Sequence, residues 1–421
     1  MNGYRLLEGV NPTSSLSLGE HIEVHGPLNL PGKRGNQAWA DAMLHELEIS
    51  GLTGRGGGRF PTATKVAYVA SQRRKGRMVV NLMEGEPASQ KDSVLAAFAP
   101  HLILDGAQVL AALIGADRIV ICIADDNDRI AQLMERAIAD RRGLDERPME
   151  IERPHGRYVA SEETALAHFF DEGASLPRFR PSRPSPVIAK GRVLLVDNAE
   201  TCANVGLIAR HGGQWWSSGD ATHSPESTLV TISGAVDAPG VFEVALGTSL
   251  GDIVALARPR GGIAGILLGG YGGTWVSPSA LDSPYSPSGM AAHGGNLGAG
   301  IVVVLGADVC PIAETARIAR WMANESAGQC GPCLFGLPRM AGQIEALATG
   351  RHSANADRSL LDLTDILEGR GACAHPDGVI RMVRSALHVF ADDVATHQHQ
   401  KTCGRVGAKT YLTLPPQEEL F

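Results

Sequence analysis

The segment from Gly51 to Lys65 is rich in glycine and carries two arginines and a lysine. Glycine weakens the interior of a helix or strand, so this composition does not suit a core element. It does suit a loop that turns its backbone N–H groups toward an anionic ligand and has basic side chains nearby. A flexible surface linker is the alternative, but Phe60 and Pro61 are apolar and stiff, and helix-like sequence follows them. The segment therefore predicts a phosphate-binding loop.

Polar residues follow an apolar run at 78–83 that predicts a short buried strand. Asn81, Glu84 and Glu86 lie at its carboxyl end, where ligands bind in parallel α/β sheets. A carboxylate there can hold a ribose hydroxyl or the N–H of a ring. The alternative is a solvated turn in which the two glutamates only face water.

Two further polar segments stand at predicted helix starts. Glu162 and Glu163 are adjacent carboxylates, which the positive end of a helix dipole favours. Asn198 follows a buried strand and can hydrogen-bond the edge of a planar heterocycle. The simpler interpretation of both segments is helix capping, by Ser161 in the first and by Asn198 in the second.

Cys330 and Cys333 form a C-x-x-C pair with glycine and proline between them, a turn that can bring two thiolates to one metal site. Cys373 lies between two predicted helices and can fold back onto the pair. The alternative is an unrelated thiol pair and a core cysteine. Packing is expected for the cysteines in apolar contexts, Cys122, Cys202 and Cys310. A solvated tail is expected for the two histidines that could otherwise bind metal, His397 and His399.

The composition of the chain limits the classes of protein to which it can belong. Its 421 residues are 44% hydrophobic and 20% charged, as in ordinary globular proteins, and a net charge of −7 does not suggest nucleic-acid binding. No apolar run is long enough to span a bilayer, and the N-terminus lacks the apolar core of a signal peptide. Seven cysteines without an export signal argue for reduced thiols, which are available for metal or redox chemistry.

Strands alternate with helices in the first half of the chain, which predicts a parallel α/β sheet. Residues 1–36 are expected to be mostly loop, and residues 174–190, rich in proline, arginine and serine, a linker or an anion-facing loop. Helices are expected at 38–48, 62–71, 102–114, 128–139 and 162–170, and strands at 78–83, 118–124, 149–152 and 193–196.

From Ser227 the pattern changes to short strands around one helix, which predicts a small β-grasp-like module. The strands are expected at 229–233, 241–244 and 266–268, and the helix at 250–257. A strand at 301–305 leads into a C-terminal helical bundle, with helices at 311–322, 334–347, 359–368 and 378–391. The expected domains are 1–225, 226–295 and 296–400, followed by a tail at 401–421.

Five motifs in this order resemble those of the flavin-binding subunit of NADH:quinone oxidoreductase, the 51 kDa or NuoF family of respiratory complex I. Diaphorase subunits of NAD-linked hydrogenases and formate dehydrogenases are similar too. The resemblance covers roughly residues 40–395. The matched motifs are Gly51–Val66, Asn81–Ala88, Tyr158–Thr164, Val196–Thr201 and Glu325–Cys333. The chain looks like a divergent paralogue of this family. The resemblance implies a Rossmann-like FMN-binding domain, a ubiquitin-like β-grasp (SLBB) module and a helical bundle carrying an iron–sulfur site.

The resemblance also implies roles for individual residues. FMN would be held by the matched positions Gly54, Arg55, Gly56, Gly57, Lys65, Asn81, Glu84, Glu163, Asn198 and Thr201. NADH would stack on the flavin near Phe60, with Glu86 and Glu163 as the catalytic residues lining its pocket. Hydride would pass from nicotinamide to flavin. Electrons would then leave singly through an iron–sulfur cluster on Cys330, Cys333 and Cys373.

The cluster site departs from the family, whose first cluster cysteine is Ala327 here. Three thiolates can hold a [3Fe–4S] cluster. They can also hold a [4Fe–4S] cluster whose fourth iron takes a non-cysteine ligand. That ligand could be water, Ser326 or a partner's residue, and Cys403 is a further option. Loss of the cluster is the remaining alternative.

The flavin and nucleotide sites depart as well. Arg59 and Ser161 replace glycines, Met83 replaces an aspartate, and Asp197 replaces an asparagine. Arg183 aligns with an aromatic residue that stacks on adenine in the family. Arginine can also stack, or bind an additional phosphate, so NADPH stands beside NADH as the donor.

The sequence thus predicts an FMN-dependent NAD(P)H dehydrogenase that passes single electrons to a ferredoxin, to a thioredoxin-like [2Fe–2S] subunit or to another electron-transfer subunit. A cytoplasmic location is expected, free or attached to a membrane through partner subunits, with no membrane span and no nucleic-acid partner. Two alternatives stay open. One is a degenerate member that binds flavin or a cluster and relays electrons without oxidising NADH. The other is a module that binds a small ligand through its β-grasp part.

Overall fold

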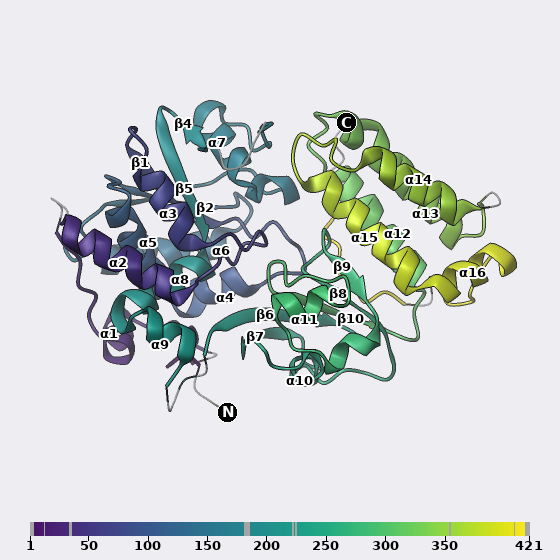
Figure 1. Cartoon of the computed structure of the whole chain (residues 1–421), viewed down its shortest axis with the longest axis horizontal. Helices are drawn as coiled ribbons and strands as arrows, with labels where there is room; N and C mark the ends of the chain where they lie inside the picture. The colour runs from purple at the N-terminus through teal and green to yellow at the C-terminus, as the bar shows by residue number, and fades with distance from the viewer. Residues whose placement is uncertain are drawn as a thin grey trace.

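The computed structural model describes residues 4–11, 13–32, 36–180, 186–220, 223, 225–352, 355–407 and 409–416. These residues form two five-stranded mixed sheets followed by a C-terminal group of helices (Figure 1). The first sheet and its helices lie on the left in Figure 1, the second sheet below the centre, and the C-terminal helices on the right.

The first sheet has the strand order β3-β2-β1-β5-β4. The strands are β1 (Gly76–Leu82), β2 (Ile119–Ile123), β3 (Met149–Glu152), β4 (Ile188–Ala189) and β5 (Arg192–Asn198). The pairings among β3, β2, β1 and β5 are parallel, which confirms the predicted parallel arrangement. The two-residue edge strand β4 runs antiparallel to β5 and was not expected.

Side chains of β1 alternate between two apolar layers, as expected for a strand buried on both faces. Met78 and Val80 pack into the larger core, and Val79 and Met83 pack into the smaller one. Helices of the larger core are α2 (Gln37–Ser50), α3 (Thr62–Ala70), α5 (Pro100–Leu113), α6 (Asp128–Asp140) and α8 (Ala199–His211). The smaller core is covered by α7 (Glu163–Glu172).

Several helices lie where none was expected. Helix α1 (Leu18–His25) lies in the supposed N-terminal loop, and Ser17 and Glu20 form a capping box at its start. The other unexpected helices of this half are α4 (Lys91–Phe98) and α9 (Gly213–Ser218), and of α8 only the possible capping residue Asn198 was anticipated. Helix α8 is buried over most of its length, so its sequence lacks the polar stripe that marks a surface helix.

The second sheet has the order β7-β6-β10-β8-β9. Its strands are β6 (Ser227–Gly234), β7 (Gly240–Ala245), β8 (Ile263–Leu268), β9 (Thr274–Val276) and β10 (Ile301–Gly306), with helices α10 (Leu250–Leu256) and α11 (Pro287–Ala291) beside them. Strand β10 pairs parallel with β6 and antiparallel with β8. Strand β10 is therefore the central strand, and the sheet continues past the expected boundary between 295 and 296.

The C-terminal helices share one apolar core. They are α12 (Pro311–Asn324), α13 (Leu337–Ala348), α14 (Ala356–Leu367), α15 (His375–Val389) and α16 (Ala391–Gln400), with a π-helical turn at Pro332–Gly336 before α13. The residues after α16 fold back, and the backbone N–H groups of Tyr411 and Leu412 donate to the Glu314 carboxylate. Within the described residues, no single helix is long and apolar enough to cross a membrane. Helices α4 and α5 pass that test only as a pair bent by 101°.

Candidate functional site

The glycine-rich segment forms a closed loop at the carboxyl ends of β1 and β5. The Gly54 N–H donates to the Phe60 carbonyl at 2.9 Å, which closes the loop at its base. The N–H of Arg55 donates to the hydroxyl of Thr201 in the first turn of α8, also at 2.9 Å. The backbone from Gly56 to 58 is exposed at the tip. The loop is therefore held at one side and open at the other.

The guanidinium of Arg55 points into the protein. It donates to Glu226 at 3.1 Å, lies 3.9 Å from Glu200 and stacks over Trp216. The side chain is 1% exposed. Arg55 therefore contributes its backbone to the loop, while its charge balances buried carboxylates.

Lys65 and Asp197 form an ion pair beside the loop. The Lys65 ammonium donates to the Val196 carbonyl and, at 3.2 Å, to Oδ1 of Asp197. Burial opposes the charge of Lys65, but Asp197 and Glu163 outweigh it and raise the pKa of the lysine. Burial also raises the pKa of Asp197 against the pull of Lys65. Among the described residues, Oδ2 of Asp197 has no hydrogen-bond partner.

The polar residues after β1 are held by backbone groups. The Asn81 amide donates to the Ser161 carbonyl at 2.7 Å. Glu84 accepts the N–H groups of Asp92 and Ser93 at 2.9 and 3.0 Å, so it caps the start of α4. The solvated-turn interpretation does not hold for Glu84, because backbone donors bind both carboxylate oxygens.

Glu86 lies in a largely apolar surrounding. It accepts the N–H of Tyr271 at 2.9 Å and that of Ala88 at 3.4 Å, and the Tyr158 hydroxyl bonds to it as well. Burial raises the pKa of Glu86 to about 7. The side chain can therefore carry or release a proton near neutral pH.

The adjacent carboxylates at the start of α7 have different partners. Glu162 caps the helix, accepting the N–H of Thr164 at 2.7 Å, whereas the Ser161 hydroxyl donates back to the Tyr158 carbonyl. Capping by Ser161 is therefore wrong. Glu163 forms an ion pair with Arg180. Phe60, at the end of the glycine-rich loop, is 48% exposed.

Asn198 caps α8, as the simpler interpretation predicted. Its Oδ1 accepts the Thr201 hydroxyl at 2.5 Å and the Thr201 N–H at 3.2 Å, and its amide donates to Asp92 at 3.2 Å. A Cβ on Gly56 would lie 3.9 Å from the Asn198 side chain. Asn198 and Thr201 thus support the loop from beneath.

A buried network of charged residues lies next to Asn198 and Thr201, and the sequence did not predict it. Lys91 donates to Glu200 at 2.7 Å and to Asp92 at 3.2 Å, and it is 1% exposed. Burial raises the pKa of Asp92 to about 6. The pKa of Glu200 is lowered, because Lys91 and Arg55 outweigh the effect of its burial. The only signal in the sequence is an adjacent lysine and aspartate before an apolar run.

The three cysteines expected to bind a cluster lie near one another. The Cys333 thiol interacts with those of Cys330 and Cys373, and the Ser326 hydroxyl bonds to it. Burial and the neighbouring thiols raise the pKa of Cys333 to about 12. Cys403 belongs to a different group, with Cys310 and His397, so it is not placed as the fourth ligand of this site.

Aromatic residues connect the two halves of the candidate site. The Tyr158 ring lies edge-on to Trp321 with centroids 5.8 Å apart, and it lies 5.3 Å from the His375 ring. His375 follows Cys373 by two positions, and Tyr158 bonds Glu86. Tyr158 therefore contacts both the loop after β1 and the C-terminal helices α12 and α15.

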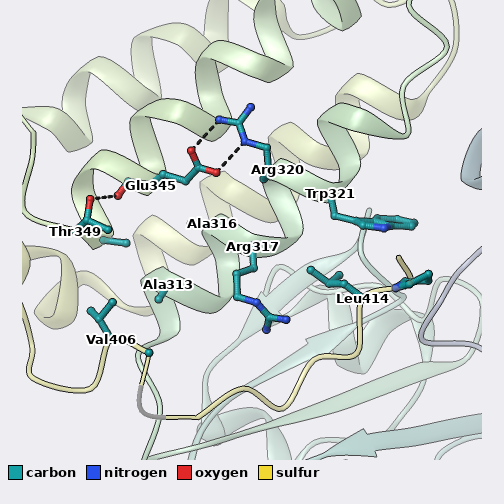
Figure 2. A pocket seen from close by; sticks show the side chains of 12 residues that line it. Ala313, Ala316, Arg317, Arg320, Trp321, Glu345, Thr349, Val406 and Leu414 are labelled. Atoms are coloured by element: carbon teal, nitrogen blue, oxygen red, sulfur yellow. Dashed lines mark hydrogen bonds and ion pairs between the residues drawn. The ribbon is translucent and has the colours of Figure 1, made fainter. Parts of the chain in front are cut away.

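A pocket of about 530 Å³ lies away from these motifs, between α12, α13 and the C-terminal segment. Figure 2 shows Arg320 paired with Glu345 on one side and Arg317 and Leu414 on another. None of the expected site residues lines it. Arg183, expected to face the nucleotide, lies outside the described residues.

Comparisons with known proteins agree with these motifs. The family pattern described as Nuo51 FMN-binding domain matches residues 47–207. The NADH-ubiquinone oxidoreductase-F iron-sulfur binding region matches residues 313–397. The NuoF protein of the Mycobacterium bovis NADH-quinone oxidoreductase is 29% identical over 385 residues, 86% of each chain. A NuoF protein of the Rhizobium meliloti NADH-quinone oxidoreductase is 28% identical over 86% of this chain and 90% of its own.

Solved structures give the same result. A chain of an NAD+-reducing [NiFe]-hydrogenase in the H2-reduced state is 30% identical, with a TM-score of 0.75 over 88% of this chain. The air-oxidised state gives a TM-score of 0.76 at 29% identity. The present chain spans 66% and 65% of the length of those hydrogenase chains. From its two matched regions, its relatives and its fold, the chain belongs to the NuoF (Nuo51) family of FMN-containing NADH dehydrogenase subunits, which are oxidoreductases.

Proposed function

We propose that the chain is an FMN-dependent NAD(P)H dehydrogenase subunit whose flavin lies against the glycine-rich loop. The observation that carries this proposal is the convergence of the exposed loop backbone, Lys65 and Oδ2 of Asp197, which is unpartnered among the described residues, at the carboxyl ends of β1 and β5. In this proposal, the first sheet with its helices is the family's Rossmann-like FMN domain, and the second sheet is its β-grasp (SLBB) module.

The donors and acceptors present fit FMN. The exposed backbone at Gly56 and Gly57 suits a phosphate, and the charged Lys65 lies beside it. The second carboxylate oxygen of the buried Asp197 suits a ribityl hydroxyl or a ring N–H. Gly54 and Asn81 complete the proposed contacts. The side chains of Arg55, Glu84, Asn198 and Thr201 act indirectly by holding the loop and the strand ends in place.

The nucleotide would approach past Phe60, the exposed aromatic residue at the end of the loop. Glu86 and Glu163 line the proposed approach, and Arg180 neutralises Glu163. FMN, when bound, accepts a hydride and can release its electrons one at a time. This chain's residues would orient the nicotinamide and, at Glu86, hold a proton near neutral pH.

Cys330, Cys333 and Cys373 would carry the cluster that receives the electrons. Either a [3Fe–4S] cluster or a [4Fe–4S] cluster with a non-cysteine fourth ligand fits three thiolates, and Ser326 bonds one of them. The acceptor would be a ferredoxin, a thioredoxin-like [2Fe–2S] subunit or another subunit of a larger complex, as the names of the relatives suggest.

The test is anaerobic purification with quantification of FMN and iron, followed by reduction with NADH or NADPH in parallel. We expect bound FMN that bleaches with at least one of the two nucleotides, and an iron–sulfur signal by electron paramagnetic resonance. Lys65→Met should lose FMN while its circular dichroism is unchanged, and Lys75→Met, at an exposed position, should keep it. A protein without flavin would refute the proposal. Bound flavin that neither nucleotide reduces would instead support the degenerate relay subunit.

A further inference from the structure

We propose that Cys310, His397 and Cys403 bind a zinc ion that is separate from the flavin and cluster sites. Their ligand atoms all lie within 4.8 Å of one another, and Sγ of Cys310 lies 3.2 Å from Nε2 of His397. No other group of three His, Cys, Asp or Glu side chains in the described part of the chain meets this spacing.

The spacing fits one tetrahedral ion. Bonds of about 2.3 Å from zinc to sulfur and about 2.0–2.1 Å to nitrogen place ligand atoms about 3.6–3.8 Å apart. The observed distance between sulfur and nitrogen is shorter by a few tenths of an ångström. A zinc ion therefore enters with a small outward movement of the side chains.

The ligand types also favour zinc. Thiolate and imidazole together suit zinc, whereas calcium and magnesium take oxygen ligands. Cys310 occupies the N-cap of α12, where its sulfur accepts the N–H of Ala313 at 3.3 Å.

His397 lies on α16 and its side chain is fully buried. Its Nε2 contacts the Cys310 sulfur, its Nδ1 has no hydrogen-bond partner among the described residues, and the Leu347 carbonyl lies near the ring. A buried imidazole with a thiol as its side-chain partner is poorly satisfied by packing alone. A metal on Nε2 would use that lone pair, and the carbonyl is the outer partner that such ligands usually have.

Cys403 is partly exposed in the segment after α16. Arg405, two residues later, pairs with Asp393 on α16 and donates to the Ala307 carbonyl at 3.0 Å. These bonds hold the segment next to the start of α12 independently of any metal. The fourth position of the ion would face solvent at Cys403 and take a water molecule.

The test is zinc and iron quantification on the full-length protein purified anaerobically. We expect about one zinc ion per chain. Zinc should fall to background in Cys403→Ser and Cys310→Ser, with iron per chain unchanged. Cys403 lies in a partly exposed loop, so its variant should fold, which circular dichroism checks. Cobalt loaded in place of zinc should give the visible bands of tetrahedral thiolate coordination, and these should be lost in Cys403→Ser.

Two controls separate this site from others. Cys122→Ser, at a buried cysteine within the first sheet, should keep its zinc. Cys330→Ser should keep it too, and loss of zinc in that variant would place the metal in the cluster site and overturn the proposal. A protein that binds no zinc even after incubation with zinc chloride would also overturn it, as would mass spectrometry showing a disulfide between Cys310 and Cys403.

Discussion

Arg59 has a backbone conformation that suits glycine, with φ at 44°. For a residue with a side chain, the left-handed region costs roughly 1–2 kcal/mol. The Arg59 guanidinium lies within electrostatic range of Glu226 and Tyr285. Glycine would adopt this positive φ without that cost.

This strain can be measured with a matched pair of variants. Arg59→Gly and Arg59→Ala both remove the guanidinium, but only glycine adopts the positive φ without cost. We expect Arg59→Gly to have a free energy of unfolding about 1 kcal/mol higher than that of Arg59→Ala. Urea titration of both proteins measures the difference. Equal stability, or a more stable alanine variant, would contradict the strain.

Glu86 should make stability fall as the pH rises toward neutrality. Its pKa is about 7 in the folded protein against an ordinary value of 4.5, so the folded state keeps a proton that the unfolded chain releases. The free energy of unfolding should therefore decrease between about pH 4.5 and pH 7. Glu86→Gln should lack this contribution, and urea unfolding across the window measures it.

Comparing wild type with Glu86→Gln removes the contribution of other titrating groups to the pH dependence of stability. Asp92, with a pKa of about 6, acts in the same direction in both and cancels in the difference. If the curves of wild type and Glu86→Gln run parallel across the window, Glu86 does not titrate there.

At the scale of elements, helices α5 and α8 cross with their backbones in contact. A Cβ at Gly106 would lie 1.6 Å from the Cys202 carbonyl oxygen, and one at Gly206 would lie 3.0 Å from the Leu102 carbonyl oxygen. This close crossing fixes the position of α8 relative to α5. The first turn of α8 supports the glycine-rich loop through Thr201. Gly106 therefore packs against Cys202, directly beside the residue of α8 that supports the loop.

Gly106→Ala should destabilise the protein strongly. Alanine favours a helix by about 1 kcal/mol over glycine, but the clash with backbone forces the helices apart, at a cost of several kcal/mol. Gly19→Ala in α1 is the control, because a Cβ there meets nothing within 4 Å and should leave stability unchanged or raised. Thermal unfolding of both variants measures the effect. A melting temperature of Gly106→Ala at or above that of wild type would contradict the close crossing.

The elements also show where sequence reasoning works. Strand β3 begins and ends where expected, and β1, β2 and β5 shift by only a few residues, because short apolar runs between turns mark buried strands well. Only the capping residue of α8, Asn198, was anticipated, because the helix itself is buried nearly all round and lacks an amphipathic pattern. The motif residues were found by their order along the chain, yet the partners of Glu84, Glu163 and Arg55 come from distant segments that no local pattern indicates.

The burial of His397 also could not be predicted from local sequence. Its position near the end of the chain predicted a solvated tail, but α16 packs against α12 and α13 and buries the ring. Burial of a polar residue depends on tertiary packing, and a single sequence carries no signal for a contact with Cys310 across 87 positions.

For the molecule as a whole, Glu200 joins the two sheets. It receives Lys91 from α4, and its other oxygen accepts the hydroxyl of Thr228 and the N–H of Leu229 on β6, at 2.7 and 2.9 Å. Glu243 on β7 likewise accepts N–H groups from Arg5 and Leu6. Buried carboxylates therefore hold the second sheet against the first.

Lys91→Met should weaken this junction. It leaves Glu200 and Asp92 as buried carboxylates with less compensation, which typically costs about 3–5 kcal/mol. Lys75→Met is the matched control at an exposed position and should change stability by less than about 0.5 kcal/mol. Chemical denaturation of both proteins makes the comparison. A loss below about 1 kcal/mol for Lys91→Met would show that the pair does not hold the sheets together.

The position of β10 has a consequence for synthesis of the chain on the ribosome. The β6–β7 and β8–β9 hairpins emerge first, but they become one sheet only when β10 inserts between β6 and β8. Until then each hairpin presents an unpaired strand edge, a surface open to pairing with other nascent chains. The second sheet is therefore complete only after synthesis has passed β10, shortly before the start of α12.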